Sequence, residues 1–307
     1  MRSEKKKGKK WLKITGIIVL VLLIAGGAYA FTVYKSLQNA VETMHQPVKR
    51  TETVKRETPV KLEKKDPFSV LMLGVDERAG DKGRSDTIIV LTVNPNNNSV
   101  KMLSIPRDTR TEIVGKGTED KINHAYAFGG VPMSMNTVEK FLDIPIDYYM
   151  QINMEGFKDI VNAVGGVTVQ NTLDFTQDNF HFPVGPVQLN GEKALSFSRM
   201  RYEDPRGDFG RQTRQRQILQ AVIKEGTSIS TLANFSNIFT ALGANIKTNL
   251  TFNQMVDIQK NYRGAGGNIQ QMEVKETGTM INKIYYGIVA PEEKDRIQKE
   301  LKAQLEL

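Results

Sequence analysis

Apolar residues gather in one long run near the amino terminus and in several short runs further along the chain. The long run, Ile14–Tyr34, has 21 residues and no charge. As a helix it would be about 30 Å long, which is the thickness of the hydrocarbon layer of a bilayer. The short runs Phe68–Val75, Thr87–Val93 and Val100–Ile105 are almost unbroken and rich in β-branched residues. That pattern is typical of strands buried on both faces.

The links between these three strands are too short to hold a crossover helix. Ten residues separate Asp76 from Thr87, and the turn Asn94–Asn98 joins the second strand to the third. We therefore expect two hairpins and three antiparallel strands in sequence order. Two later segments, Asp147–Ile152 and Gln270–Val274, are expected to complete the sheet.

Helical periodicity follows in the rest of the chain. The predicted helices are Met133–Leu142, Gly156–Val164, Asp208–Glu225, Thr231–Leu242, Thr251–Tyr262 and Glu292–Leu301. One of them opens with Thr251 and Gln254, a capping-box pair. The combination predicts one α/β domain in which helices cover both faces of a sheet.

The flanks of the long apolar run predict how it lies in a membrane. Lysines cluster before it, Trp11 lies at one interface, and Tyr29 and Tyr34 lie near the other. The positive-inside rule then places the amino terminus in the cytoplasm and everything after Lys35 outside. A cleaved signal peptide is the alternative, because Ala25–Ala30 is rich in small residues. The apolar run is longer than the usual 7–15 or so residues of a signal peptide, which favours an uncleaved anchor in the cell membrane.

These features divide the chain into four parts. The sequence predicts a basic cytoplasmic tail (1–13), a transmembrane signal-anchor helix (14–34), an extracellular stalk (35–65) and an extracellular domain (66–307). The predicted stalk is polar and charged and contains Pro47 and Pro59, which is typical of a spacer that lifts a domain off the membrane. Its basic charge also suits anionic membrane lipid.

Composition excludes several classes of function. The chain of 307 residues has no cysteine, so it has no disulfide framework, thiolate metal site or cysteine nucleophile. Its net charge is +8, but residues 1–13 contribute +6 and residues 35–65 contribute +4, which leaves the remainder near −2. The basic character therefore belongs to the tail and the stalk, and no nucleic-acid-binding domain is expected. The chain has no P-loop, GxSxG elbow or paired-histidine motif.

Charged residues border the three predicted strands at one edge. Asp76 follows the first strand, Arg84 and Asp86 lead into the second, and Arg107 follows the third. In an antiparallel meander these ends lie at the same edge, so we expect the side chains to cluster. Two carboxylates there can hold a Mg²⁺-like cation and leave coordination positions for phosphate oxygens. The alternative is that both are ordinary turn aspartates paired with arginines.

The stretch Ser196–Arg216 holds six arginines and no lysine. Arginine without lysine favours two-pronged recognition of phosphate or carboxylate. A solvated, self-paired charge run is the alternative. If Phe197–Arg201 is extended, Arg199 and Arg201 lie on one face.

A helix that begins after Asp208 would carry one stripe of side chains that faces inward, at spacings of four, three and four residues. The stripe consists of Arg211, Gln215, Ile218 and Val222. Asp208 is either the cap of this helix or a residue of the site. Arg206 and Arg216 are expected to face solvent, and Arg214 is intermediate.

Together these motifs resemble those of the LytR–CpsA–Psr family of cell-wall enzymes. The matching segments are LGVDER (73–78), GRSDTIIVLTVNP (83–95), SIPRDT (104–109), KINHAYAFGG (121–130), GGV (165–167) and LNGEKALSFSRMRYEDPRGDFGRQTRQRQIL (189–219). Their order agrees, as do the single amino-terminal anchor and the outside domain. The resemblance covers roughly Asp66 to Leu250, and its motifs are specific jointly rather than one by one.

The resemblance implies an α/β/α sandwich with a central mixed sheet that binds a polyprenyl-pyrophosphate-linked glycopolymer. Members transfer the polymer with its phosphate to peptidoglycan and release polyprenyl phosphate, and wall teichoic acid is the favoured cargo here. Carried onto this sequence, Asp76 and Asp86 would hold Mg²⁺ or Mn²⁺, and together with Arg107 they would form the catalytic set. Asp76 is the favoured proton acceptor. The residues implied to grip the pyrophosphate are Arg84, Arg107, Arg199, Arg201, Arg211 and Gln215.

The chemistry of such a transfer suits a site outside the cell. A pyrophosphate anhydride already stores the energy of the reaction, so no ATP is required, and phosphoryl transfer depends mainly on positioning and charge stabilisation. One alternative is a non-enzymatic anchored receptor or scaffold that binds anionic wall polymer or lipid pyrophosphate. The acidic pair argues against it, because an anion receptor gains nothing from Asp76 and Asp86 unless a metal joins them. A wall hydrolase or pyrophosphatase is a further alternative, in which water replaces the sugar as acceptor.

Overall fold

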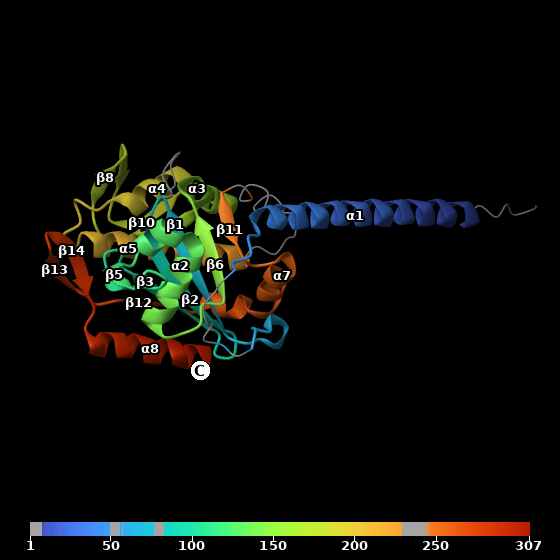
Figure 1. The fold of residues 1–307 in the computed structure, drawn as a ribbon. Helices are drawn as coiled ribbons and strands as arrows, with labels where there is room; N and C mark the ends of the chain where they lie inside the picture. Colours follow the sequence, from blue (N-terminus) through green and yellow to red (C-terminus); the bar gives the residue numbers. More distant parts are fainter. Residues whose placement is uncertain (1–7, 50–55, 57, 77–82, 229–242, 244) are drawn as a thin grey trace, which may run out of the picture.

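A computed structural model describes residues 8–49, 56, 58–76, 83–228, 243 and 245–307. A six-stranded sheet forms the centre of the molecule, with the strands in the order β11-β6-β1-β2-β3-β12 (Figure 1). Its strands are β1 (Phe68–Val75), β2 (Ser85–Asn94), β3 (Ser99–Ile105), β6 (Tyr148–Ile152), β11 (Ile246–Thr248) and β12 (Ile269–Glu273). All five strands predicted from the sequence are present in this sheet, and only the short β11 was not anticipated.

The register of the three central strands confirms the predicted meander. β1 pairs antiparallel with β2, and β2 pairs antiparallel with β3, so that Leu73 lies opposite Ile88 and Ile88 opposite Ile105. β6 and β12 add to the two sides in parallel, and β11 pairs antiparallel with β6. The sheet is therefore mixed, and the end of β1, the start of β2 and the end of β3 share one edge.

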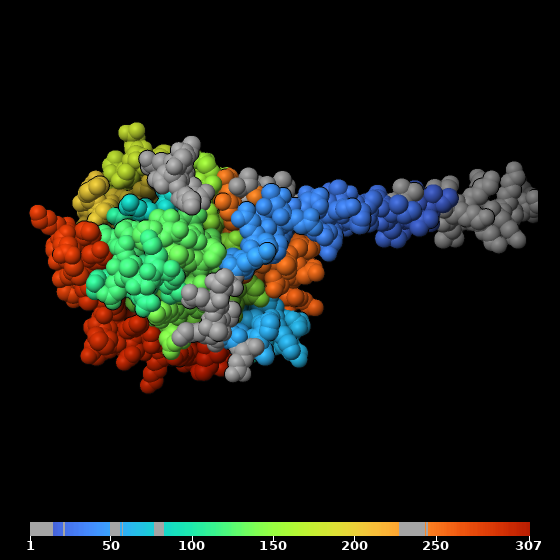
Figure 2. Space-filling model, in the orientation of Figure 1, coloured from blue at the N-terminus to red at the C-terminus, as the bar shows by residue number. Residues whose placement is uncertain are grey.

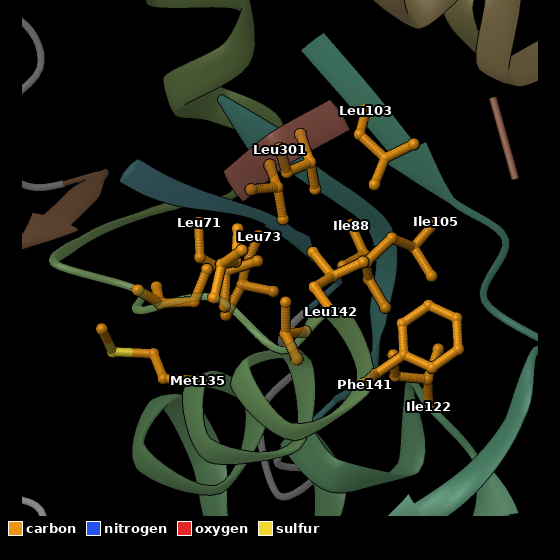
Figure 3. Close-up of a cluster of buried hydrophobic side chains, with 14 of the residues drawn as sticks. Leu71, Leu73, Ile88, Leu103, Ile105, Ile122, Met135, Phe141, Leu142 and Leu301 are labelled. Atoms are coloured by element: carbon orange, nitrogen blue, oxygen red, sulfur yellow. The ribbon is translucent and has the colours of Figure 1, made fainter. Parts of the chain in front are cut away.

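Helices α2 (His124–Leu142) and α8 (Pro291–Leu305) cover one face of the sheet. Their apolar side chains, among them Met135, Phe141 and Leu301, pack on Leu73 and Ile88 in the largest buried cluster (Figure 3). The predicted helices Met133–Leu142 and Glu292–Leu301 are confirmed within these two elements. α2 begins earlier than predicted, because two residues with non-helical dihedral angles, the pair 129–130, join a first turn to the main helix.

The other face carries α7 (Phe252–Asn261) with the short helices η1 (Leu62–Lys64) and η2 (Arg263–Gly267). Three aromatic rings, those of Phe68, Tyr148 and Tyr262, meet edge to face in this second core. The predicted capping box of α7 is present in full: the Thr251 hydroxyl accepts from the Gln254 amide, and the Gln254 side chain accepts from the Thr251 backbone. Helices on both faces confirm the α/β/α sandwich.

A further layer sits beside the sheet and was only partly predicted. It contains α3 (Met154–Ala163), α4 (Gly191–Arg199) and α5 (Asp208–Ser228), with the hairpins β7 (Val167–Asn171)–β10 (Gly185–Leu189) and β8 (Phe175–Gln177)–β9 (Phe180–Phe182). The rings of Phe175, Phe182 and Phe197 pack against one another at its centre, and Ile218 of α5 is fully buried against this cluster. The predicted helices over 156–164 and 208–225 correspond to α3 and α5.

Two small hairpins complete the fold. β4 (Arg110–Ile113) pairs with β5 (Thr118–Lys121), and β13 (Thr277–Ile281) pairs with β14 (Ile284–Ile288). Neither belongs to the central sheet. The sequence did not reveal them, because strands of four or five residues at the surface lack a continuous apolar run. The predicted helix 231–242 lies outside the described residues.

The amino-terminal helix α1 (Gly8–Met44) is longer than the predicted membrane segment. Residues 15–44 are long and apolar enough to cross a membrane. Beyond residue 34 the helix continues, and its side chains Val41 and Met44 are buried against Ile246, while the Tyr34 ring meets Phe252 of α7 edge to face. The last turns of α1 therefore dock on the domain, which differs from a spacer that begins at residue 35. The reason is an apolar stripe at helical spacing, hidden among polar residues.

Candidate functional site

The shared edge of the central strands brings an aspartate and an arginine together. Asp86 lies at the start of β2 and Arg107 follows β3, and the Arg107 Nη1 donates to Asp86 Oδ1 at 2.8 Å. The Asp76 backbone N–H approaches the Arg84 carbonyl at 3.5 Å, after a bulge between Gly74 and Val75. The predicted clustering at this edge is thus observed for the side chains of Asp86 and Arg107. Asp76 and Arg84 lie at the same edge, where their backbones approach each other.

The amino-terminal turn of α5 forms the other side of the cluster. Asp208 is the first residue of the helix, and its carboxylate lies 2.6 Å from Arg211 Nη2 and accepts from Gln212 Nε2 at 2.8 Å. The side chain of Arg211 is only 14% exposed, and its Nε finds no hydrogen-bond acceptor within the described part of the chain. A buried donor without an acceptor costs stability. An oxygen atom of a bound anion would supply the acceptor that Arg211 Nε needs.

Electrostatics show that the two sides face each other. Burial acts to lower the pKa of Arg107, but the hydrogen bond and charge of Asp86 outweigh it, with help from Asp108 and Asp208, so the pKa is raised. Asp208 belongs to α5, about a hundred residues further along the chain. The two segments therefore meet across one space at the sheet edge.

Arg211 experiences the opposite balance. The pKa of Arg211 is lowered, and burial is the largest cause. The positive charges of Arg107 and Arg201 add to this effect, although Asp208 and Asp86 act against it. Two other guanidinium groups thus lie within electrostatic reach of Arg211. Like charges held together in this way are stabilised by a bound anion, and the two-pronged geometry of guanidinium suits phosphate oxygens.

The structure separates Arg199 from this group. Residues 197–199 are helical, at the end of α4, so the extended conformation considered for 197–201 is wrong and Arg199 does not share a strand face with Arg201. Arg199 is exposed and donates toward the Met154 thioether. The apolar side chains of α4 pack into the phenylalanine cluster, and this packing favours a helix there. Arg84 is also exposed, and Gln215 lies half-buried one turn beyond Arg211.

The remaining arginines of this stretch have structural contacts. Arg206 is exposed, as predicted. The prediction for Arg216 was wrong: it is 2% exposed, and it donates to the side chains of Glu273 and Gln271 (Oε1) on β12. Arg214 is also buried and binds Asp204 at 2.7 Å. Periodicity suggested a single inward stripe, but α5 is packed between the sheet edge and the phenylalanine cluster, so more than one of its sides is covered.

Sequence reasoning missed Glu276, which lies between β12 and β13. Its carboxylate accepts from the Thr109 hydroxyl at 2.9 Å, and Thr109 follows Arg107 by two residues. Burial raises the pKa of Glu276 to about 7; the Thr109 hydrogen bond opposes this, and the charges of Asp108 and Asp208 reinforce it. No local motif marks Glu276, because only the tertiary fold brings residue 276 beside residues 108, 109 and 208.

The raised pKa of Glu276 predicts a pH-dependent stability. Between its ordinary pKa of 4.5 and the folded value of about 7, the unfolded chain loses this proton first, so stability falls as pH rises. The penalty is absent below pH 4.5 and complete above pH 7, and it amounts to at most about 3 kcal/mol. Glu276→Gln should remove it. We expect the variant to melt higher than the parent chain at pH 8 and equally at pH 4 in detergent-solubilised full-length protein; an equal melting temperature at pH 8 would contradict the assignment.

A comparison with known families decides the relationship of this chain. The LytR_cpsA_psr family model matches residues 31–303. The chain belongs to the LytR_cpsA_psr family. The match covers the central sheet, the arginine cluster and α5, and it confirms the resemblance seen in the motifs.

Individual relatives agree with the family. The chain is 54% identical over 304 residues to the polyisoprenyl-teichoic acid–peptidoglycan teichoic acid transferase TagU of Bacillus cereus, and the match covers 99% of both chains. The crystal structure of TagU from B. subtilis superposes with a TM-score of 0.65 at 51% identity, covering 79% of this chain and 98% of that one. A structure of TagT bound to LIIa-WTA superposes with a TM-score of 0.73 at 30% identity, covering 86% of this chain and all of that one.

The sheet edge carries carboxylates, which are ligands of the kind that magnesium prefers. Among the described residues no group of three or more His, Asp or Glu side chains forms a complete protein cage for a metal. Mg²⁺ does not require one, since it commonly keeps several waters and binds through one or two carboxylates and substrate phosphates. Asp86 is 44% exposed and pairs with Arg107, and Asp76 directly follows the neighbouring strand β1. This donor set suits a hard cation that is shared with a phosphate ligand.

Proposed function

We propose that this chain is a membrane-anchored phosphotransferase that moves an anionic glycopolymer, wall teichoic acid, from a polyprenyl-pyrophosphate carrier to peptidoglycan. The observation that carries the proposal is the half-buried guanidinium cluster of Arg107, Arg201 and Arg211, in which Arg211 Nε finds no acceptor among the described residues. Relatives that are 50–54% identical to this chain are named teichoic acid transferases. The proposal joins the chemistry of the site to the reaction named for those relatives.

We further propose that α1 anchors the chain with its amino terminus in the cytoplasm and the domain outside. The apolar residues of α1 from 15 onward, preceded by lysines, support this orientation. Because the last turns of α1 dock on the domain, the domain would be held close to the outer surface of the membrane. A lipid carrier in the same leaflet would then lie within its reach.

The proposed reaction replaces a phosphoanhydride bond by a phosphodiester bond. A hydroxyl oxygen of peptidoglycan attacks the phosphorus that bears the polymer, the anhydride bond to the second phosphorus breaks, and polyprenyl phosphate leaves. Arg107, Arg201 and Arg211 would hold the non-bridging oxygens and stabilise the charge that gathers on them. The hydroxyl proton would pass to a carboxylate at the site, for which Asp76 is the favoured candidate.

Asp76 and Asp86 would also hold Mg²⁺ or Mn²⁺. A bound divalent cation neutralises phosphate charge and fixes the geometry of the pyrophosphate. In this proposal the Asp86 carboxylate would help to hold the cation while Oδ1 keeps the hydrogen bond from Arg107. Arg84, Arg199 and Gln215 remain proposed pyrophosphate contacts that would close on the ligand.

The Asp86→Asn variant tests the proposal. Loss of one anionic ligand should raise the Mg²⁺ concentration needed for half-maximal transfer and lower transfer by at least about 100-fold. The measurement is transfer of lipid-linked polymer to peptidoglycan by full-length protein in vesicles, together with release of polyprenyl phosphate. Full activity of the variant at the same Mg²⁺ concentration would contradict the assigned site.

The same assay separates the alternatives. Tight binding of lipid pyrophosphate without release of polyprenyl phosphate would identify a receptor. Release that does not depend on peptidoglycan would identify a pyrophosphatase, in which water is the acceptor.

A further inference from the structure

The hairpin β13–β14 extends one exposed face toward the arginine cluster. Gly278 lies opposite Gly287, and Met280 lies opposite Tyr285, so all four residues share one face of the hairpin. We call these four residues the hairpin face. Met280 is 64% exposed and Tyr285 is 47% exposed. The outer end of the face is therefore apolar, aromatic and open to solvent.

The two glycines make the face flat and connect its ends. A Cβ atom at Gly278 would lie 2.6 Å from the Tyr285 hydroxyl oxygen, so the tyrosine ring lies across that glycine. A Cβ atom at Gly287 would collide with the carboxylate of Glu276. The Tyr285 ring thus lies against one glycine of the hairpin face and the Glu276 carboxylate against the other.

The inner end of this face reaches the candidate site. Glu276 is hydrogen-bonded to Thr109, and the backbone of Gly287 donates to the Asp108 carbonyl at 2.9 Å. The pKa of Tyr285 is raised, and burial is the largest cause. The charges of Glu276, Asp108 and Asp208 add to this effect, and the charge of Arg201 opposes it. Tyr285 is therefore within electrostatic reach of an arginine and an aspartate of the site.

A tyrosine on the opposite side fixes the hairpin to the body. Tyr286, on that side, is 8% exposed, its hydroxyl donates to Asp120 at 3.4 Å, and the side chains of Arg110 and Lys121 lie over its ring. The hairpin is thus held in a set orientation, with the Tyr285 side left open. A fixed, exposed aromatic ring beside a reaction site is a feature of binding surfaces.

We propose that the hairpin face binds the acceptor glycan, with a sugar ring stacked on Tyr285 and its chain leading past Glu276 to the arginine cluster. This inference rests on the proposed transferase function. A tyrosine ring has a flat apolar surface and a polar end, which match the C–H face and the hydroxyl groups of a sugar ring. The tyrosine side chain also loses little conformational entropy on binding.

Charge and position favour the acceptor over the other ligands of the reaction. Residues 277–288 carry a single charge, that of Lys283, so they suit uncharged sugar rings better than a phosphate-rich donor polymer. The hairpin also lies at the end of the body opposite the departure of α1 (Figures 1 and 2). A surface on that side faces away from the membrane that α1 would span, and so toward the wall.

Full-length protein in detergent tests the inference with Tyr285→Ala and, as matched control, Tyr285→Phe, which keeps the ring. The first probe is binding to purified peptidoglycan stripped of teichoic acid. We expect Tyr285→Ala to weaken binding about tenfold, a change of about 1.4 kcal/mol, while Tyr285→Phe binds within about twofold of the parent. Equal binding by all three proteins would overturn the inference.

The transfer assay gives a second, independent measurement. Tyr285→Ala should raise the peptidoglycan concentration for half-maximal transfer about tenfold and leave the dependence on lipid-linked donor unchanged. An effect on the donor alone, or loss of binding to anionic phospholipid vesicles with normal peptidoglycan binding, would assign the face to lipid instead. If the parent chain binds peptidoglycan through Tyr285 but transfers nothing, the proposed function fails and the binding surface stands.

Discussion

Arg107→Ala will lower glycopolymer transfer on the order of 10³-fold, because an arginine that stabilises phosphoryl charge contributes that much to catalysis. Arg107 is the point where the two halves of the site meet. It is hydrogen-bonded to Asp86, and it is in electrostatic contact with Asp208 and Arg211. Its loss would remove one of the proposed phosphate contacts and also release the Asp86 carboxylate. The measurement is the initial rate of transfer by full-length protein at saturating donor.

Two further variants define the cause of this loss. Arg107→Lys keeps the positive charge but loses the two-pronged geometry, so we expect a rate between those of the parent and the alanine variant. Arg296→Ala removes an arginine that pairs with Glu293 and Glu300 on α8, away from the site, and should leave transfer unchanged. Equal rates for Arg107→Ala and the parent would remove Arg107 from the mechanism.

Asp204→Ala will destabilise the fold by about 3–5 kcal/mol, because it leaves a buried arginine without its counter-charge. The side chains of Asp204 and Arg214 are 2% and 5% exposed, and their atoms meet at 2.7 Å. Burial acts to raise the pKa of Asp204, but the hydrogen bonds from Arg214 and Arg206 outweigh it and lower the pKa. A thermal unfolding scan should show a melting temperature lower by roughly 6–20 °C.

Two further variants distinguish the effect of the Asp204–Arg214 ion pair from the effect of burial around it. Arg206→Ala removes an exposed partner of the same carboxylate and should cost at most about 1 kcal/mol. Asp204→Leu combined with Arg214→Met removes both charges and should recover much of the stability lost in Asp204→Ala. A loss of less than 1 kcal/mol in Asp204→Ala would show that Arg214 finds another counter-charge.

The sequence predicted the central sheet well because its strands are buried on both faces. Such strands need continuous apolar runs, and the short links between them allowed only hairpins. Once three strands form an antiparallel meander, the ends that carry Asp86 and Arg107 must lie at one edge. That half of the candidate site therefore follows from local pattern and simple geometry, and the observed hydrogen bond between these two residues agrees with it.

The arginines of 196–216 show where sequence reasoning ended. Composition marked all six as unusual, but their assignments depend on what each side of α4 and α5 packs against. Arg211 faces the sheet edge as periodicity suggested, whereas Arg216 is buried against β12 and Arg214 against Asp204. Helical periodicity assumes one covered side, and α5 is covered on more than one.

By itself, the sequence determined the apolar amino-terminal helix, the α/β/α class, the meander and the family. These properties depend on continuous apolar runs, short links and motifs that a single stretch of chain contains. Only the tertiary structure showed the docking of α1 on the domain, the buried partners of Arg214 and Arg216, and the approach of Glu276 and Tyr285 to the arginine cluster. The physical reason is that each of these features joins different segments of the chain, and only close packing of the finished fold decides which of them touch.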